Sequence, residues 1–414
     1  MSDEARLGTD NSGQAALEYR YQIGSAEGAI NSTWSGYYTA IHQINTVLPY
    51  FDKISGDANR KKEMQGQLLA LRAICHLNLL QSYSGRYNPS ALGVPLITAV
   101  DILAKPKRNT MGEVMKGIED DFTSANTLLS TSTKFSDTTI NYLNLMAFRA
   151  EAALYKEDYS SAVSYCNSLL SNTNLPANTK NIANGTGPLT GTAKPYADIW
   201  TDIYNADGNL NEMLFRIRYA TSGTMGGLFT TTTNDVYFAP SDKLLASFPT
   251  ANAPAAGSDV RKSLFIGTVA GKRFVNKYKG SSRGGLVLDM KWLRISEIYL
   301  MRAEALAKQS SADLTGASAD LNLLRSKRIN GYTNQTFSSA SDLMDAVVLE
   351  RYKELCFEGD RFFDLKRYNL PVNRLGSDAN TAWQNLPVND YRFLIPVPNE
   401  ELLANPNMIQ NPGY

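Results

Sequence analysis

The chain has 414 residues, of which 43% are hydrophobic and 20% are charged, so it contains ample apolar material for a large core. Its 41 basic residues nearly balance its 40 acidic residues, and a net charge of +1 gives no field that would favour nucleic-acid binding. The cysteines are too few and too scattered for a disulfide framework or a zinc site. We expect buried thiols at Cys75, Cys166 and Cys356.

The first 20 residues contain no basic start followed by an apolar run. No stretch of the chain reaches the roughly 18 apolar residues that a membrane-spanning helix needs. Taken alone, these residues predict a cytoplasmic protein.

Helical patterns dominate the first part of the chain, with predicted helices at residues 34–48, 64–83 and 111–129. An alanine-rich segment at residues 142–155 and an amphipathic segment at residues 162–170 follow, joined by the short turn KEDY. These two segments form a helix pair of the kind found in tetratricopeptide repeats.

Small residues indicate where the paired helices approach each other. Ala150 and Ala162 lie twelve positions apart, and a similar arrangement recurs around Ala303, with Leu321 and Leu324 on the next predicted helix. Stacked pairs of this kind build a curved scaffold. We therefore predict an all-α, tetratricopeptide-like helical repeat scaffold with long loop insertions and minor β structure.

Three long segments in the middle of the chain have loop composition: residues 172–194, 221–235 and 250–259. Loops of this length in a compact protein are usually functional or disordered. Seven aromatic residues are interleaved with them: Tyr196, Trp200, Tyr204, Tyr219, Phe229, Tyr237 and Phe238. Rings set among Asn, Asp and Thr suit sugar recognition, because a ring covers the C–H face of a pyranose. Most of these rings should nevertheless pack between the loops and the helices.

Residues 349–367, LERYKELCFEGDRFFDLKR, combine an apolar helix face with closely spaced charges. The spacing of the apolar positions predicts one buried face. It contains Val348, Leu349, Tyr352, Leu355 and Cys356.

Three carboxylates, Glu350, Glu354 and Glu358, lie four residues apart on the adjoining face, where like charges repel. We therefore expect cations between them, and the nearest in sequence are Arg351, Arg361 and Arg367. A helix stop at Gly359 would allow the segment FFDLKR to fold back towards the carboxylates. We expect a buried ion-pair network that includes Glu350, Glu354 and Arg361 and fixes how two helices meet.

Catalytic patterns are poorly supported. The segment GSSRG (residues 280–284) fits the Gly-x-Ser-x-Gly elbow of hydrolases, but both histidines, His42 and His76, precede the serine. A glycosidase needs two carboxylates about 5 to 10 Å apart. The best carboxylates, Glu297, Glu304, Glu350, Glu354 and Glu358, all lie on predicted core helices, where a cleft is not expected.

The segment NADGNLNE (residues 205–212) carries oxygen ligands and a glycine, but aligning it with an EF-hand loop places Ile203 and Leu214 at the first and last ligand positions. Calcium is compatible with this segment but is not predicted. No other cofactor is predicted.

Six segments of the chain resemble the SusD/RagB family of surface nutrient-binding lipoproteins. The resemblance extends from about residue 34 to residue 414, and it includes the Pro-x-Pro and Gln-Asn-Pro-Gly-Tyr ending of the family. The segments are 34–48 (WSGYYTAIHQINTVL), 68–97, 291–308 (KWLRISEIYLMRAEALAK), 319–328 (ADLNLLRSKR), 349–367 and 393–414.

This resemblance implies a noncatalytic protein that binds glycans at the cell surface and delivers them to a SusC-like TonB-dependent outer-membrane transporter. It also implies an N-terminal lipid anchor on the outer membrane, carried by an acylated cysteine that would precede the residues given. The alternatives are a peptide-binding uptake protein of the RagB type, a helical-repeat adaptor and, less favoured, a glycosidase.

We expect one SusD-like domain in three parts: a helical-repeat part at about residues 15–172, a loop-rich ligand face at about 173–290, and C-terminal helices at about 291–414. Ligand-binding residues cannot be carried over from shared motifs of the family. Position and chemistry select seven candidates: Tyr19, Tyr21, Asn31, Tyr219, Phe229, Asn234 and Tyr237.

Overall fold

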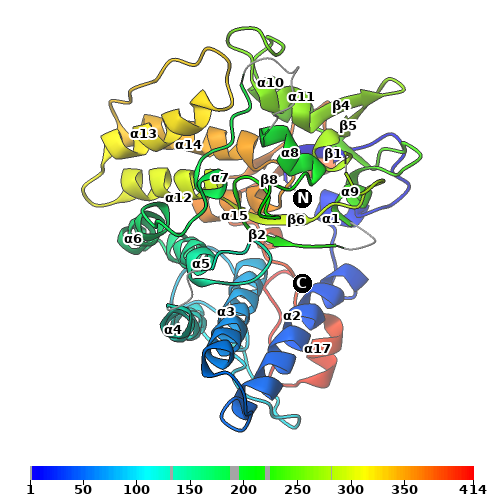
Figure 1. Ribbon diagram of the computed structural model, residues 1–414. Helices are drawn as coiled ribbons and strands as arrows, with labels where there is room; N and C mark the ends of the chain where they lie inside the picture. Colours follow the sequence, from blue (N-terminus) through cyan, green and yellow to red (C-terminus); the bar gives the residue numbers. More distant parts are fainter. Residues whose placement is uncertain (1, 131–133, 187–194, 220–223, 281) are drawn as a thin grey trace.

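The computed structural model describes residues 2–130, 134–186, 195–219, 224–280 and 282–414 (Figure 1). Helices dominate these residues, and every strand is short. The prediction of a helical, tetratricopeptide-like scaffold with minor β structure is therefore confirmed. Parts of two expected loops, residues 187–194 and 221–223, lie outside the described residues.

Five helices form the first half of the scaffold, and two of them have the predicted bounds. They are α2 (Gly28–Val47), α3 (Ala58–Tyr83), α4 (Met111–Leu129), α5 (Tyr142–Tyr155) and α6 (Tyr159–Leu170). The starts of α4 and α5 have a local cause, because both helices begin with a capping box that bonds backbone N–H groups lacking a partner within the helix.

The scaffold continues with α12 (Ile295–Lys308), α13 (Leu314–Ser326), α14 (Ala340–Glu354) and α15 (Asp360–Tyr368). The expected break between the last two helices is present, and Gly359 adopts a φ of 109° there, which favours glycine. Helix α12 packs against α13, α14 and α6, so it joins the two halves of the scaffold.

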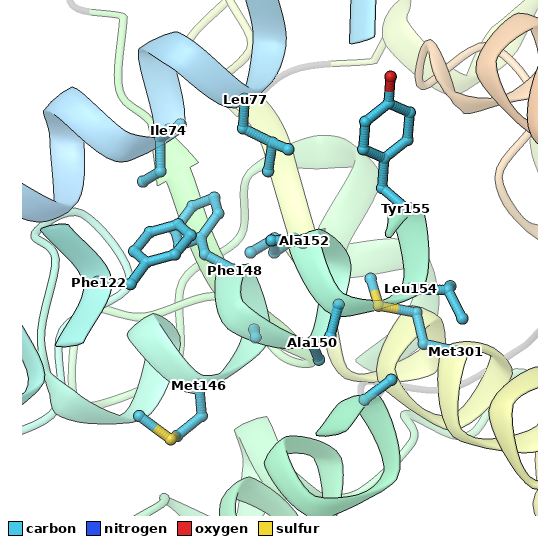
Figure 2. Packing of buried hydrophobic residues seen from close by; sticks show 14 of the residues in the cluster. Ile74, Leu77, Phe122, Met146, Phe148, Ala150, Ala152, Leu154, Tyr155 and Met301 are labelled. Atoms are coloured by element: carbon cyan, nitrogen blue, oxygen red, sulfur yellow. The ribbon is translucent and has the colours of Figure 1, made fainter. Parts of the chain in front are cut away.

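Small residues allow the helices to approach closely, as predicted. Ala150 on α5, Ala162 on α6 and Ala303 on α12 are fully buried. Figure 2 shows Ala150 and Ala152 among Phe148, Leu154 and Met301. The largest hydrophobic cluster therefore runs through the stacked helices.

The remaining elements are short. The helices are α1 (Ala16–Arg20), α7 (Ala177–Lys180), α8 (Pro195–Thr201), α9 (Thr224–Phe229), α10 (Asp242–Ser247), α11 (Val260–Phe265), α16 (Thr381–Gln384) and α17 (Asn399–Ala404). The strands are β1 (Ala5–Leu7), β2 (Met213–Ile217), β3 (Phe238–Pro240), β4 (Ile266–Val269), β5 (Lys272–Val275), β6 (Met290–Arg294), β7 (Val372–Asn373) and β8 (Asn385–Leu386). They form antiparallel pairs β1–β3, β2–β6, β4–β5 and β7–β8.

The predicted buried face of α14 is partly wrong. Leu349 is 43% exposed and Val348 is only half-buried, whereas Val347, Glu350 and Glu354 are fully buried. The carboxylates take the inward face because arginines from other elements surround them there. Burial on this helix therefore follows charge pairing as well as hydrophobicity.

Glu354 lies at the centre of a buried network. It accepts hydrogen bonds from Arg294 (2.9 Å), Arg328 (3.0 Å) and Arg261 (3.1 Å). Glu358 accepts hydrogen bonds from Arg294 (2.6 Å) and from Lys277 (2.8 Å). These cations come from α11, the segment around Lys277, β6 and the residues just after α13, so the network joins segments that lie far apart in the sequence.

The predicted network of Glu350 and Glu354 is present, but its predicted cation was wrong. Arg361 bonds Asp3 at 2.9 Å, while Glu350 pairs with Arg325 (2.7 Å) and Arg261 (2.6 Å). Arg351 and Arg367, the other cations close in sequence, bond Asp364 instead. Tertiary packing supplies the partners.

A second hydrophobic cluster lies beneath the loops and fills the seam predicted for most of the aromatic rings. Four of the seven interleaved rings are buried, and the other three are partly exposed. The buried ones are Tyr196, Trp200, Phe229 and Phe238. All three cysteines are buried and free, as expected. Within the described parts of the chain, no helix is both long and apolar enough to cross a membrane.

Candidate functional site

A polar cleft of about 310 Å³, here called the loop cleft, lies where the N-terminal strand meets the loop-rich part. Strand β1 pairs with β3, and β3 in turn packs against β5, so segments distant in sequence meet there. The cleft is lined by Arg6, Leu7, Gly8, Thr9, Val236, Ala239, Gly271, Lys272, Arg273, Ser377 and Asp378.

The close approach of the two walls of the loop cleft requires glycine at position 8. A Cβ atom on Gly8 would lie 2.0 Å from the carbonyl oxygen of Val236, far inside van der Waals contact. The Gly8 N–H donates to the carbonyl of Tyr237 at 2.8 Å. The pairing of the N-terminal segment with residues 236–240 therefore holds the cleft together.

Paired charges surround the cleft. Arg6 (3.4 Å) and Arg273 (2.6 Å) both donate to Asp242, and Lys272 donates to Asp10 at 2.7 Å. The Arg273 hydrogen bond lowers the pKa of Asp242, and the Lys272 hydrogen bond lowers the pKa of Asp10. Both carboxylates are therefore ionised at neutral pH, and the cleft offers N–H donors beside anionic acceptors.

Asn234 and Tyr237 lie in the turn that follows α9. Asn234 is exposed, adopts a φ of 72°, and accepts a hydrogen bond from Lys279. Tyr237 is half-buried, and its backbone N–H donates to the carbonyl of Phe229 at 2.9 Å. Neither residue lines the loop cleft: Tyr237 directly follows the lining residue Val236 in the chain, and its side chain packs against the second hydrophobic cluster.

Tyr219 is half-buried and is positioned through its backbone. Its N–H donates to Asp289 at 3.1 Å, and its carbonyl accepts from Arg283. Asp289 also binds Arg216 and Arg283, and these arginines lower the pKa of its carboxyl. An ion-pair network therefore fixes the backbone from which the ring of Tyr219 projects.

Three predicted aromatic residues have no exposed ring face. Tyr19 and Tyr21 are buried, and Arg374 lies 3.9 Å and 4.7 Å from their ring centroids. Phe229 is buried and stacks on Tyr278 at 5.8 Å. A ring stacks on a sugar only through an exposed face, so in this structure these three rings support the loops. The hydroxyl of Tyr19 donates to the carbonyl of Asp378, directly behind the loop cleft.

Asn31 lies in a different groove, between α2 and α17. Its side chain donates to Glu400 at 2.6 Å, and the groove has a volume of about 420 Å³. The other residues lining it include Trp34, Tyr38 and His42. Asn31 is therefore not part of the loop cleft.

Sequence reasoning missed the charged residues of the loop cleft. Arg6, Lys272, Arg273 and Asp378 belong to three separate segments and form no motif. Only the pairing of β1 with β3 and the packing of β5 bring these segments together. The described residues contain no cluster of three or more His, Cys, Asp or Glu side chains that could hold a metal ion.

Comparisons with known proteins cover nearly the whole chain. A family model described as the SusD family matches residues 218–414, and a second, described as starch-binding associating with outer membrane, matches residues 3–153. The SusD-like protein P38 of Formosa agariphila is 25% identical over 92% of this chain and 79% of that protein. The starch-binding protein SusD of Bacteroides thetaiotaomicron is 34% identical over 30% of this chain and 22% of SusD.

A further relative, the SusD-like protein P2 of Formosa agariphila, is 33% identical over 30% of this chain, and the match spans about a quarter (25%) of that protein. Solved structures share the fold over nearly their whole length. A putative sugar binding protein from Bacteroides vulgatus has a TM-score of 0.82 at 25% identity, covering 100% of this chain and 91% of that one.

A SusD superfamily protein from Bacteroides thetaiotaomicron has a TM-score of 0.83 at 24% identity, covering 99% of this chain and 92% of that one, and it shows the same fold. The two family models leave only residues 154–217 between them. The sequence motifs at both ends of the chain, the helical scaffold and these matches together show that the chain belongs to the SusD-like family.

Proposed function

We propose that this protein binds oligosaccharides without cleaving them and delivers them to a SusC-like TonB-dependent transporter in the outer membrane. The observation that carries the proposal is the SusD-like fold along the whole chain, shared with a structure described as a putative sugar binding protein. The name of one curated relative, the starch-binding protein SusD, supports a carbohydrate ligand.

The loop cleft supports this proposal locally. Arg6, Lys272 and Ser377 line the cleft with polar groups suited to sugar hydroxyls, and the half-buried Tyr237 directly follows the lining residue Val236. Asn234 adds an exposed amide. We propose the loop cleft with Tyr237 and Asn234 as the principal ligand site, and we keep Tyr219 as a further contact and Asn31 as part of a separate contact.

The ionic partners of four of the five candidate carboxylates support a noncatalytic role, whereas burial raises the pKa of the fifth, Glu297. A glycosidase needs one carboxyl group that can donate a proton to the leaving group. Arginines instead bind Glu304, Glu350, Glu354 and Glu358 and hold the pKa of each below its usual value. These four carboxylates are therefore ionised and engaged in structural ion pairs.

The proposed location is the outer membrane, where a lipid anchor on residues preceding this sequence would hold the protein. The description of the family model that matches residues 3–153 supports outer-membrane association. Full-length native protein should fractionate with outer membranes and co-purify with a large TonB-dependent transporter. Recovery of that protein as a free cytoplasmic monomer would contradict this part of the proposal.

Calorimetric titration with a panel of oligosaccharides, starting with malto-oligosaccharides, tests the ligand. We expect dissociation constants in the range of about micromolar to millimolar, which corresponds to roughly 4 to 8 kcal/mol. Tyr237→Ala should weaken binding at least about tenfold, or about 1.4 kcal/mol, without unfolding the protein. Tyr50→Ala is the matched control, because Tyr50 is 54% exposed in the short 3-10 turn after α2.

Two results would contradict the proposal. If Tyr237→Ala and Tyr50→Ala bound the oligosaccharide equally well, the loop cleft would not be the site. If chromatography showed that the purified protein shortens the bound oligosaccharide over time, the noncatalytic role would be wrong.

A further inference from the structure

A second cavity lies between α15 and the C-terminal segment 388–412, away from the residues of the loop cleft. Its volume is about 300 Å³, which is within the range of small-molecule sites. Apolar side chains form much of its wall: Leu365, Leu370, Val388, Phe393, Leu394 and Pro412. Surfaces of this kind bind an apolar group rather than a row of sugar hydroxyls.

Lys366 on α15 also lines this cavity, although its side chain is only 8% exposed. Its ammonium group donates to the backbone carbonyls of Gln81 and Ser84, the latter at 2.9 Å. Ser84 directly precedes Gly85, another residue that lines the cavity. Lys366 therefore belongs to the wall of the cavity, its ammonium group bonds the carbonyl of the residue that precedes Gly85, and two bonds leave a third N–H donor.

The other charged groups of this cavity have partners of opposite charge. Arg86 donates to Glu157 at 2.8 Å, and Asp390 accepts from Arg392 at 2.8 Å. No carboxylate of the described residues forms an ion pair with Lys366, and burial is the one cause that shifts its pKa. The aromatic ring of Phe363 lies 5.5 Å from Nζ. Lys366 is therefore the uncompensated charge of this cavity, and buried charges are normally paired.

We propose that this cavity binds a small monocarboxylate with an apolar aryl or alkyl body, and that Lys366 binds its carboxylate. An anion completes the hydrogen bonding of the buried ammonium group and neutralises its charge. The apolar body then contacts side chains such as Leu365, Val388 and Phe393. This site is separate from the proposed oligosaccharide site in both position and chemistry.

Binding at this site should be coupled to proton uptake. Burial lowers the pKa of Lys366 to about 7, because its amino group is removed from water without a neighbouring carboxylate. A bound carboxylate favours the charged form and raises this pKa. Only the protonated lysine attracts the anion, so affinity should fall about tenfold between pH 6 and pH 8.

The test uses the full chain and two matched probes, 3-phenylpropanoate and the neutral 3-phenylpropanamide. Calorimetric titrations are made at pH 6 and pH 8, in two buffers that differ in ionisation enthalpy. We expect the carboxylate to bind at least about tenfold more tightly than the amide at pH 6. The buffer dependence should show proton uptake on binding near pH 7.

Three variants locate the site. Lys366→Met should remove the preference for the carboxylate over the amide. Leu370→Glu keeps Lys366 but adds a negative charge at a lining residue that is 37% exposed, so it should weaken carboxylate binding at least about tenfold without a folding defect. The matched control Leu349→Glu, at a residue 43% exposed on α14, should bind like the unmodified protein.

Equal affinity for the carboxylate and the amide would overturn the proposal, and so would undetectable binding of the carboxylate at 10 mM or unchanged binding in Leu370→Glu. Oligosaccharide binding by the same Leu370→Glu protein should be unchanged. That measurement distinguishes failure of this site from failure of the proposed function.

Discussion

The buried network around Glu354 gives the sharpest prediction about stability. Glu354 is fully buried, and three arginines bind its carboxylate at 2.9 to 3.1 Å. Glu354→Gln preserves the shape of the side chain but removes its charge, which leaves several buried guanidinium groups without full compensation. Breaking a buried ion pair in this way typically costs about 3 to 5 kcal/mol.

This loss is large compared with the roughly 5 to 15 kcal/mol that separates folded from unfolded domains. Urea denaturation should show a lower midpoint with an unchanged slope, because the surface exposed on unfolding stays the same. The control is Glu119→Gln, which removes a pair with Lys156 in which Glu119 is 46% exposed. Exposed pairs contribute about 1 kcal/mol or less, so this control should change stability little.

The structural role would be refuted by a specific result. If Glu354→Gln unfolded at the same urea concentration as the unmodified protein but no longer retained oligosaccharide, Glu354 would act in ligand binding. If both the stability and the binding were unchanged, the ion pairs would contribute nothing measurable.

Three further predictions concern separate parts of the molecule. Gly8→Ala should lower the thermal midpoint and weaken oligosaccharide binding, because its methyl group would collide with the Val236 carbonyl. Burial raises the pKa of Asp360 to about 7, so the protonated form stabilises the folded state and the free energy of unfolding falls as the pH rises towards 7. Asp360→Asn should make this fall between about pH 4 and pH 7 smaller by roughly 2 to 4 kcal/mol, as measured by urea denaturation at each pH. Burial also raises the pKa of the thiols of Cys75, Cys166 and Cys356 to about 12, so alkylation of the native protein should be slow until denaturant is added. Rapid labelling of the native protein would contradict the burial of these cysteines.

Sequence reasoning could predict only part of the candidate ligand site. Composition and position selected aromatic residues near the loops, but composition does not distinguish a ring that supports a loop from a ring that faces solvent. Phe229 and Tyr237 belong to the same segment, yet one is buried and the other is partly exposed. The division of the chain at about residues 172 and 290 stays a prediction.

The helical scaffold could be predicted from local patterns, because apolar spacing and capping residues act over a few neighbouring positions. The bounds of α4 and α5, the stop at Gly359 and the buried alanines of the helix pairs follow from such local signals. The partners of the buried charges and the residues of the loop cleft depend instead on tertiary packing. Glu354 pairs with arginines up to 93 residues away, and Arg6 meets Asp242 across 236 residues. Such contacts depend on how separate elements pack, and no local sequence pattern specifies which distant side chain becomes the partner.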